Sequence, residues 1–323
     1  EMQQAFNQYW EPFNVVGGRY IEDGVTKKAY GWKQFKRWEW FQQSRLDPNG
    51  EFPRSDINLI EWRDYLNSHP EANNRLFSTS NWTYAGSNNS AGGYAGIGRL
   101  NCIAFHPSNV NTFWVGTPSG GLWKTIDAGN TWTTNTDSSL PVLGVSSIAI
   151  DYTNSSIMYI ATGDGESDWN SATHSAGVLK STDGGITWNT TGLNWSVTSE
   201  LIIRRLLIDP TNPLVLFAAA KDGIWRTVDG GNTWSKQVSG FFRDIEFKPG
   251  NSNYLYASTH KVSGVGAKIF RSTDNGLNWT QVHSFSSTAV VQCEISICAA
   301  NPTLVEFLAV NPTRGMEGLY RSN

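Results

Sequence analysis

The sequence predicts an all-β fold, a β-propeller of four-stranded blades, and three observations lead to this prediction. First, one nine-residue motif occurs four times, as KTIDAGNTW (124–132), KSTDGGITW (180–188), RTVDGGNTW (226–234) and RSTDNGLNW (271–279). Second, its aspartates recur at intervals of 56, 46 and 45 residues, close to the length of one propeller blade. Third, the 323 residues include 31 glycines and 15 tryptophans but only 16% charged residues, which is typical of a β-rich chain with many tight turns.

Residues 1–76 differ from the rest and predict an N-terminal helical extension. Tryptophans and phenylalanines spaced by three residues within 27–46, and a capped apolar pattern within 55–70, predict two helices. A shorter helix is expected around 2–10. We expect this extension to pack on the propeller through its tryptophans.

Residues 77–323 predict the propeller itself, because short apolar runs alternate there with turns rich in Gly, Asn, Pro and Ser. Each repeat shows a first strand ending in a polar turn, a second strand, a third that runs into the motif, and a fourth that begins at its tryptophan. Five blades are visible. The last is incomplete, with three strands expected at 291–297, 305–310 and 318–322 and no fourth, and seven or more blades are expected in the full chain. Because 319–322 reads like the start of another motif, the chain is expected to continue past 323. A strand at 77–85 is expected to complete the last blade.

The motif is predicted to shape the turn between the third and fourth strands. Its aspartate can accept hydrogen bonds from nearby amides, and its glycine adopts positive φ at little cost. Its tryptophan is expected to cover the hairpin and pack on the next blade. Because a catalytic group is not needed four times, we interpret all copies as structural. The residues concerned are Asp127, Gly129, Trp132, Asp183, Gly185, Trp188, Asp229, Gly231, Trp234, Asp274, Gly276 and Trp279.

Composition excludes several classes of partner. The net charge is −3 without a clustered basic excess, so no nucleic-acid partner is predicted. No apolar run approaches the ~18 residues of a membrane span, so no transmembrane segment is predicted. Cys102, Cys293 and Cys298 lack metal-site spacing and are interpreted as buried free thiols.

The motif matches S/T-x-D-x-G-x-x-W, and the repeats in 99–323 resemble the Asp-box, or BNR-repeat, proteins, which include sialidases, sortilin-type receptors and xyloglucan-cleaving glycosidases. Two stretches, GGYAGIGRLNCIAFHPSNVNTFWVGTPSGGLWKT and ATGDGESDWNSATHSAGVLKSTDGGITWNTTGL, are similar to large propeller proteins of Bacteroidota exported by the type IX secretion system. The resemblance implies a secreted or cell-surface protein, on the extracellular side of the outer membrane. It also implies the type IX export machinery as a partner in transit.

One long loop, 163–177, joins a second and a third strand on the face where ligands of Asp-box propellers usually bind. Its three carboxylates suggest an acid/base pair or a Ca²⁺ site, and a solvated acidic loop is the simpler explanation. No other cofactor is predicted. The candidate residues of this loop are Asp164, Glu166, Asp168, Trp169 and His174.

Two arginines occupy equivalent places in their repeats. Arg204 and Arg243 each lie six residues before a turn proline, as does Asn101, so we expect them at the start of innermost strands near the central mouth. With Arg99 they form a second candidate ligand site, because the resemblance to sialidases implies arginines that pair with a carboxylate. The sialidase signature RIP is absent, and no Tyr–Glu nucleophile pair can be assigned. Pairing of Arg204 with a carboxylate such as Asp244 is the simpler explanation.

The sequence therefore favours a binding or adhesion module, exported by the type IX system, with a glycan or a surface protein as its ligand. The alternative is a glycoside hydrolase acting on an extracellular polysaccharide through carboxylates on the loop-rich face. A second alternative is a sortilin-like, peptide-binding propeller. Catalytic residues stay unassigned, with Asp164, Glu166 and Asp168 as candidates. A carboxyl pair ~5–9.5 Å apart in an open groove would favour hydrolysis.

Overall fold

The computed structural model describes residues 2–43, 46, 49–50, 56–69, 98–136, 139–166, 173–262, 264–286 and 289–322. The chain forms two compact units, residues 1–57 and 58–323, and each is described by itself. The strand expected at 77–85 lies outside the described residues, as do Asp168 and Trp169.

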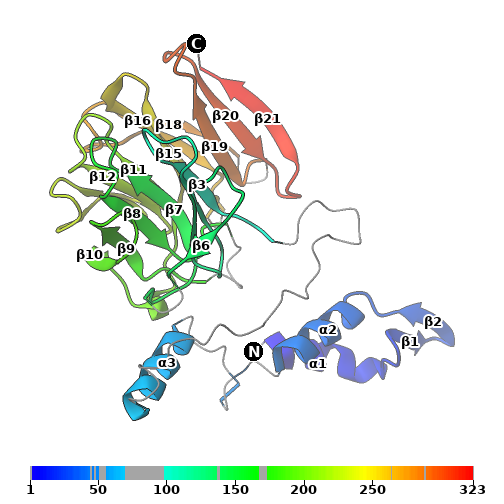
Figure 1. Ribbon diagram of the computed structural model, residues 1–323. Coiled ribbons are helices and arrows are strands. Elements are labelled where there is room, and N and C mark those ends of the chain that lie inside the picture. Colours follow the sequence, from blue (N-terminus) through cyan, green and yellow to red (C-terminus); the bar gives the residue numbers. More distant parts are fainter. Residues whose placement is uncertain are drawn as a thin grey trace. The chain divides into compact units, whose positions relative to one another are not determined.

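The first unit combines two helices with a β-hairpin (Figure 1). The helices expected around 2–10 and within 27–46 are both present. Phe6 of the first helix stacks on Phe35 of the second, with ring centroids 3.7 Å apart. The hairpin turns at Asp23 and Gly24, whose φ angles of 52° and 76° are those of a two-residue turn that continues the strand twist. The elements are α1 (Met2–Trp10), the 3₁₀ helix η1 (Glu11–Phe13), β1 (Arg19–Glu22), β2 (Val25–Lys28) and α2 (Trp32–Gln43).

A third helix, α3 (Ile57–Ser68), forms where the pattern within 55–70 predicts it. No helix in the described part of the chain is long and apolar enough to cross a membrane.

The second unit confirms the prediction of an all-β propeller. Its described residues form four four-stranded sheets and a fifth sheet of three strands, each an antiparallel meander that makes one blade. The strands of blade 1 are β3 (Cys102–Phe105), β4 (Phe113–Gly116), β5 (Leu122–Thr125) and β6 (Thr133–Thr134); of blade 2, β7 (Val145–Ile150), β8 (Met158–Thr162), β9 (Gly177–Ser181) and β10 (Asn189–Asn194); of blade 3, β11 (Ile203–Ile208), β12 (Leu216–Ala220), β13 (Gly223–Thr227) and β14 (Ser235–Ser239); of blade 4, β15 (Phe242–Lys248), β16 (Asn251–Thr259), β17 (Lys268–Ser272) and β18 (Thr280–Ser284); and of blade 5, β19 (Gln292–Ile297), β20 (Val305–Val310) and β21 (Met316–Arg321).

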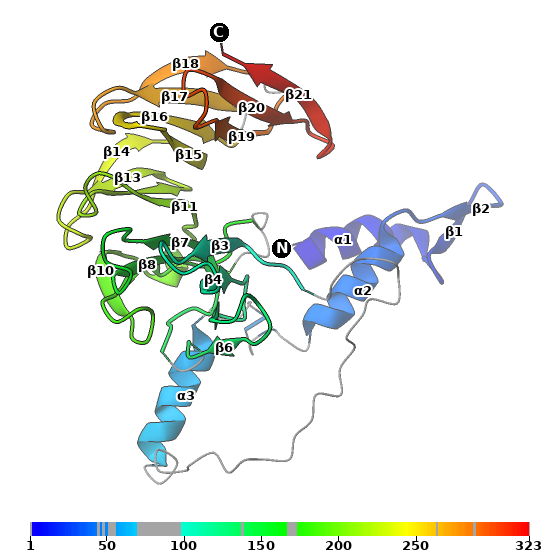
Figure 2. The same ribbon diagram turned by 45° about the horizontal axis from the view of Figure 1, so that its top comes forward.

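The blades stand face against face in a fan. Figure 2 shows β11 and β15 on the inner side of the fan, and β10 and β14 on its outer side. The first strands of successive blades, β3, β7, β11, β15 and β19, contact one another in that order. These inner strands therefore line the inner side of the fan along the central axis, and their first residues lie at one end of that axis, which we call the mouth.

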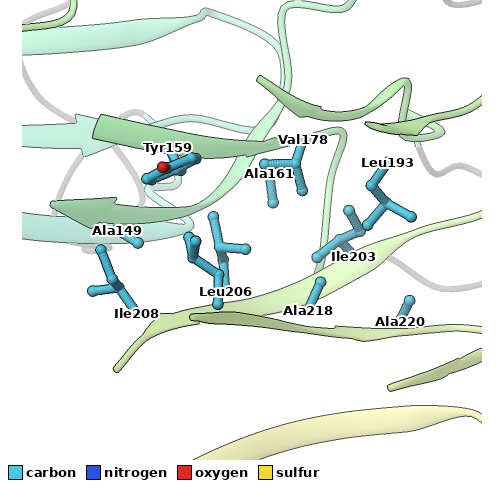
Figure 3. Packing of buried hydrophobic residues seen from close by; sticks show 11 residues of the cluster. Ala149, Tyr159, Ala161, Val178, Leu193, Ile203, Leu206, Ile208, Ala218 and Ala220 are labelled. Carbon is cyan, nitrogen blue, oxygen red and sulfur yellow. The ribbon is translucent and has the colours of Figure 1, made fainter. Parts of the chain in front are cut away.

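The hydrophobic core lies between the blades. Figure 3 shows one cluster, in which Tyr159 of blade 2 meets Leu206 and Ile208 of blade 3. Every residue of β8 and of β12 is buried, because each second strand is covered by a neighbouring blade on both faces. The run of three alanines in β12, residues 218–220, lets the sheets approach closely.

The nine-residue motif closes the turn between the third and fourth strands. In blade 2, Asp183 accepts hydrogen bonds from the backbone N–H of Ile186 and Thr187, at 3.0 and 2.9 Å, and from the Thr187 hydroxyl at 2.6 Å. The buried hydroxyl of Ser181 donates to Asp183 and accepts from the Gly185 N–H. The hydrogen bond from the Thr187 hydroxyl, followed by that from its N–H, lowers the pKa of Asp183 to about 2. Blades 1, 3 and 4 repeat the arrangement at Asp127, Asp229 and Asp274.

The expectation that the motif tryptophan packs on the next blade is wrong. Trp188, Trp234 and Trp279 each pack on the hydrophobic cluster shared with the preceding blade. The motif glycine faces the same way. At Gly276, where φ is 75°, a Cβ atom would lie 2.2 Å from Cε1 of Phe217 in the preceding blade. Glycine is therefore needed there both for the backbone conformation and for the packing.

The first residue of the motif ties its blade to the next one. Lys180 Nζ lies over the Tyr159 ring and donates to the carbonyl of Gly230 in the following motif, at 3.0 Å. Arg226 does the same over Phe217, donating to the carbonyl of Asn275 at 2.9 Å. We call this contact the interblade latch. In both places, a cation of one blade thus holds the motif of the next blade against the blade that carries the cation.

The three cysteines are free thiols, as expected, but only Cys293 is buried, whereas Cys102 is half-buried. Cys298 is exposed, because it follows the end of β19. Burial raises the pKa of the Cys102 and Cys293 thiols to about 12, so both are protonated and unreactive at neutral pH.

Candidate functional site

The candidate site lies at the mouth of the propeller axis, at the start of the inner strands. Neighbouring strands run antiparallel, so the loop between a second and a third strand lies at the opposite end of the blade from the motif. The long loop between β8 and β9 therefore shares the mouth with the first residues of β11 and β15. Arg204 and Arg243 are the second residues of those two strands.

Three arginines from three blades hold the beginning of this loop. Arg99, which precedes β3, pairs with Asp164. Arg204 of blade 3 donates to the carbonyl of Gly165. Arg243 of blade 4 donates to Glu166 at 2.5 Å. We call these three residues the arginine cradle. The three candidate arginines are therefore brought together with Asp164 and Glu166, which pair with Arg99 and Arg243 respectively.

Arg243 is the centre of the cradle. Its side chain is only 10% exposed, and its Nε lies 2.6 Å from Oε1 of Glu294 in blade 5. One guanidinium thus joins Glu166 of blade 2 to Glu294 of blade 5. Burial lowers the pKa of Arg243, but the Glu294 and Glu166 carboxylates outweigh burial and leave it raised. For Glu294 the balance is opposite, since burial raises its pKa more than the guanidinium lowers it.

Arg204 is the least satisfied member of the cradle. It is buried, and its guanidinium lies 5.1 Å from the centroid of the Phe241 ring. Its Nε has no hydrogen-bond partner among the described residues. Burial, and then the charge of Arg243, lower the pKa of Arg204 to about 10.

The predicted pairing of Arg204 with Asp244 is wrong. Arg205, the next residue along β11, takes that place, with Nε 3.8 Å from Asp244 and Nη2 2.5 Å from Glu246. Consecutive residues of a strand point to opposite faces, and the β11–β12 pairing also shifts register between Ile203 and Arg205. A one-residue difference therefore changes which arginine meets the carboxylates of blade 4.

The remaining loop candidates lie elsewhere or outside the described residues. Asp164 is buried, and its N–H donates to the carbonyl of Thr173 at 2.8 Å, which closes the base of the loop. His174 is half-buried, and burial lowers its pKa. Asp168 and Trp169 are not described. The suggested Ca²⁺ site is not assembled by the described residues, which contain no group of three Asp, Glu, His or Cys side chains that could hold a metal.

Sequence reasoning missed Glu294, Glu246 and Arg205 as parts of the mouth. The sequence did contain a signal for two of them. Arg205 is the third residue of β11 and Glu294 is the third residue of β19, so both occupy equivalent positions, next to the position of Arg204 and Arg243. Chemically, the mouth is a network of ion pairs in which each described candidate carboxylate has an arginine partner.

No protein-family model matches the chain. A xyloglucanase of Paenibacillus sp is 30% identical to it over 220 residues, covering 58% of this chain and 21% of the relative. A xyloglucanase of Hypocrea jecorina is 28% identical over 197 residues, covering 58% and 22%. The chain thus spans about a fifth of the length of these curated relatives.

A crystal structure of an ancestral GH74 enzyme superposes with a TM-score of 0.53 and 17% sequence identity, over 70% of this chain and 33% of that one. The superposition supports the propeller fold. The sequence matches favour a glycoside-hydrolase-like protein over the binding or adhesion module that the sequence analysis places first.

Proposed function

We propose that the chain is part of a glycoside-hydrolase-like propeller protein that acts on an extracellular polysaccharide of the xyloglucan type. The observation that carries the proposal is the 30% identity to a xyloglucanase over 220 residues. The propeller fold and the loop-rich mouth are compatible with it, because the mouth presents side chains from several blades to one ligand.

Glu166 is the described carboxylate best placed to meet a sugar at the mouth. Its side chain is 41% exposed, whereas that of Asp164 is 6% exposed. Retaining and inverting glycosidases use two carboxyl groups, one as general acid and one as nucleophile or base. In this proposal Arg243 orients Glu166, Asp164 anchors the loop through Arg99, and Asp168 of the same loop is the candidate for the second carboxyl group.

The test is hydrolysis of tamarind xyloglucan by the full-length protein, followed as new reducing ends and by mass spectrometry of the products. Glu166→Gln should lower the rate by at least about 100-fold. Glu306→Gln is the matched control, because Glu306 of β20 also accepts from an arginine, Arg321, at 2.9 Å, but lies in an exposed pair of blade 5. Unchanged hydrolysis in Glu166→Gln would remove this residue from the reaction.

A binding or adhesion role is the second candidate, and one observation favours it. Asp164 and Glu166 are each ion-paired with an arginine, so both described carboxylates of the loop already hold it in place across the blades. Retention of the protein in xyloglucan-containing native gels, with no product released by the full-length protein, would favour this role. Binding of an acidic peptide at the mouth instead would favour the sortilin-like alternative.

We also propose that the protein is an Asp-box propeller exported to the cell surface by the type IX system. Support comes from the four motif copies and from the resemblance to exported propeller proteins of Bacteroidota. Loss of the protein from the surface fraction in a strain lacking the export channel would be the expected result. Unchanged surface exposure in that strain would contradict the proposal.

A further inference from the structure

The helix α2 of the first unit carries a row of alternating aromatic and basic side chains. Trp32, Lys36 and Trp40 follow one another at four-residue steps, and Lys33 and Arg37 lie beside them at the same step. These five residues line an open groove of about 340 Å³. We call it the α2 groove.

Packing within the first unit leaves most of this groove open, although Lys36 Nζ donates to Oδ1 of Asn7 in α1 at 3.4 Å and the Lys33 side chain lies against Gly18. The opposite side of α2 faces α1, where Phe35 stacks on Phe6 and Glu39 accepts a hydrogen bond from Gln3 at 2.7 Å. Trp40 is left 77% exposed. Its indole lines the groove together with that of Trp32, so two aromatic rings, not one isolated ring, are available to a ligand on this side of the helix.

The α2 groove also carries positive charge that its own unit neutralises only in part. Lys36 Nζ lies 2.7 Å from Oε2 of Glu39. Lys33 and Arg37 are exposed, and neither forms an ion pair with another described residue. Two cations without an ion-pair partner in the described part of the chain therefore flank the pair of indoles, and a negatively charged ligand would complement them.

We propose that the α2 groove binds an acidic polysaccharide. The sugar rings stack on Trp32 and Trp40, and the carboxylate groups of the polymer pair with Lys33 and Arg37. The two tryptophans are eight residues apart, roughly 12 Å along a helix, so one extended chain can contact both. The site requires neither hydrolysis nor the propeller mouth and thus goes beyond the function proposed above.

The order of residues distinguishes a polysaccharide from a membrane surface. A helix that lies in a lipid interface presents a continuous apolar stripe, with its cations on the other side. In the α2 groove Lys36 stands between the two indoles and interrupts any such stripe. Separate rings alternating with cations match a polymer of charged sugar units.

The test measures binding of the purified protein to polygalacturonate by affinity electrophoresis and by titration at two salt concentrations. Arg37→Glu should weaken binding about tenfold, and the loss should shrink at high salt. Trp40→Ala should weaken binding about fivefold at both salt concentrations, because stacking is not screened. Lys28→Glu and Tyr30→Ala are the matched controls. Lys28→Glu makes the same charge change as Arg37→Glu. Tyr30→Ala removes an aromatic ring that, like the ring of Trp40, is 77% exposed. Both control residues belong to the same unit but do not line the groove.

Both controls should change the affinity by less than about twofold, and all four melting temperatures should match that of the parent protein. Equal losses in Arg37→Glu and Lys28→Glu would overturn the site in favour of diffuse charge attraction. Retention by phosphatidylglycerol vesicles, with none by polygalacturonate, would overturn it in favour of a membrane surface. Because the readout is binding of a non-substrate polymer, the result stands whether or not the propeller cleaves xyloglucan.

Discussion

At the scale of single residues, the motif aspartates are exposed or half-buried carboxylates whose pKa values are lowered. Hydrogen bonds from Thr187 and from Thr233 lower the pKa of Asp183 and of Asp229, respectively, to about 2. An unfolded aspartate titrates at about 3.9. The hydrogen bonds that shape each turn therefore also link the stability of the fold to pH.

We expect the melting temperature to fall as the pH is lowered from about 4 to about 2. Above this window both the folded and the unfolded states are ionised at these aspartates. Within it the unfolded state binds protons first, so each motif loses its contribution as the pH falls through the folded-state pKa. Calorimetry across this range should show that the melting temperature depends less steeply on pH in Asp229→Asn than in the parent protein, because the asparagine cannot titrate. Parallel curves for the variant and the parent would contradict this assignment.

Residue-scale contacts at the mouth were predictable only in part. The equal offsets of Arg204 and Arg243 from a proline place both at the second position of an inner strand. Their partners were not predictable, because a partner is set by register and by side-chain reach across blades. Arg243 meets Glu166 over a separation of 77 residues, and no local pattern encodes such a contact.

At the scale of elements, the strands and helices followed from periodicity and turn chemistry. Residues 291–297 and 305–310 predicted β19 and β20 to within one residue. The hairpin β1–β2 was missed, although Asp23-Gly24 between two short segments with β-branched and aromatic residues, RYIE and VTKK, is a strong hairpin signal. The direction in which the motif packs was also missed, because one repeat does not show which neighbour covers it.

The glycine of the motif provides the test of that packing direction. Gly276→Ala should destabilise the fold by about 3 kcal/mol, because the added methyl group meets the fully buried Phe217 and the backbone has positive φ. Gly184→Ala is the control. Its φ is 73°, but no atom lies within 4 Å of its Cβ position, so only the backbone cost of about 1 kcal/mol is expected. Urea unfolding of both variants measures the difference, and equal losses would mean that strain alone makes glycine necessary.

At the scale of the whole molecule, two kinds of contact join the blades. Hydrophobic clusters and interblade latches connect nearest neighbours, while one ion pair at the mouth, between Arg243 and Glu166, connects two blades that are not neighbours. Arg243 links blade 2 to blade 4 through Glu166, across the intervening blade 3. The mouth therefore ties together several blades that each hydrophobic cluster joins only in pairs.

Arg243→Met should consequently destabilise the propeller by about 1–3 kcal/mol, since it leaves Glu166 and Glu294 without their shared cation. The cost is below that of a fully buried pair, because both carboxylates remain 41% exposed. Arg321→Met removes the exposed pair with Glu306 and should change the unfolding free energy by less than about 0.5 kcal/mol. Chemical denaturation compares the Arg243→Met and Arg321→Met variants. Indistinguishable midpoints would show that the pairing of Arg243 with Glu166 and Glu294 adds nothing to stability.

The orientation of the motif has a further consequence for the order in which the protein is made. Trp234 and Gly231 of blade 3 pack on blade 2, and Lys180 of blade 2 is already in place to hold Gly230. During synthesis, or during threading through a pore with the N-terminus leading, each new blade therefore meets a finished docking surface made by its predecessor. The blades can therefore assemble in order from the N-terminus, because each motif packs on residues that precede it in the sequence.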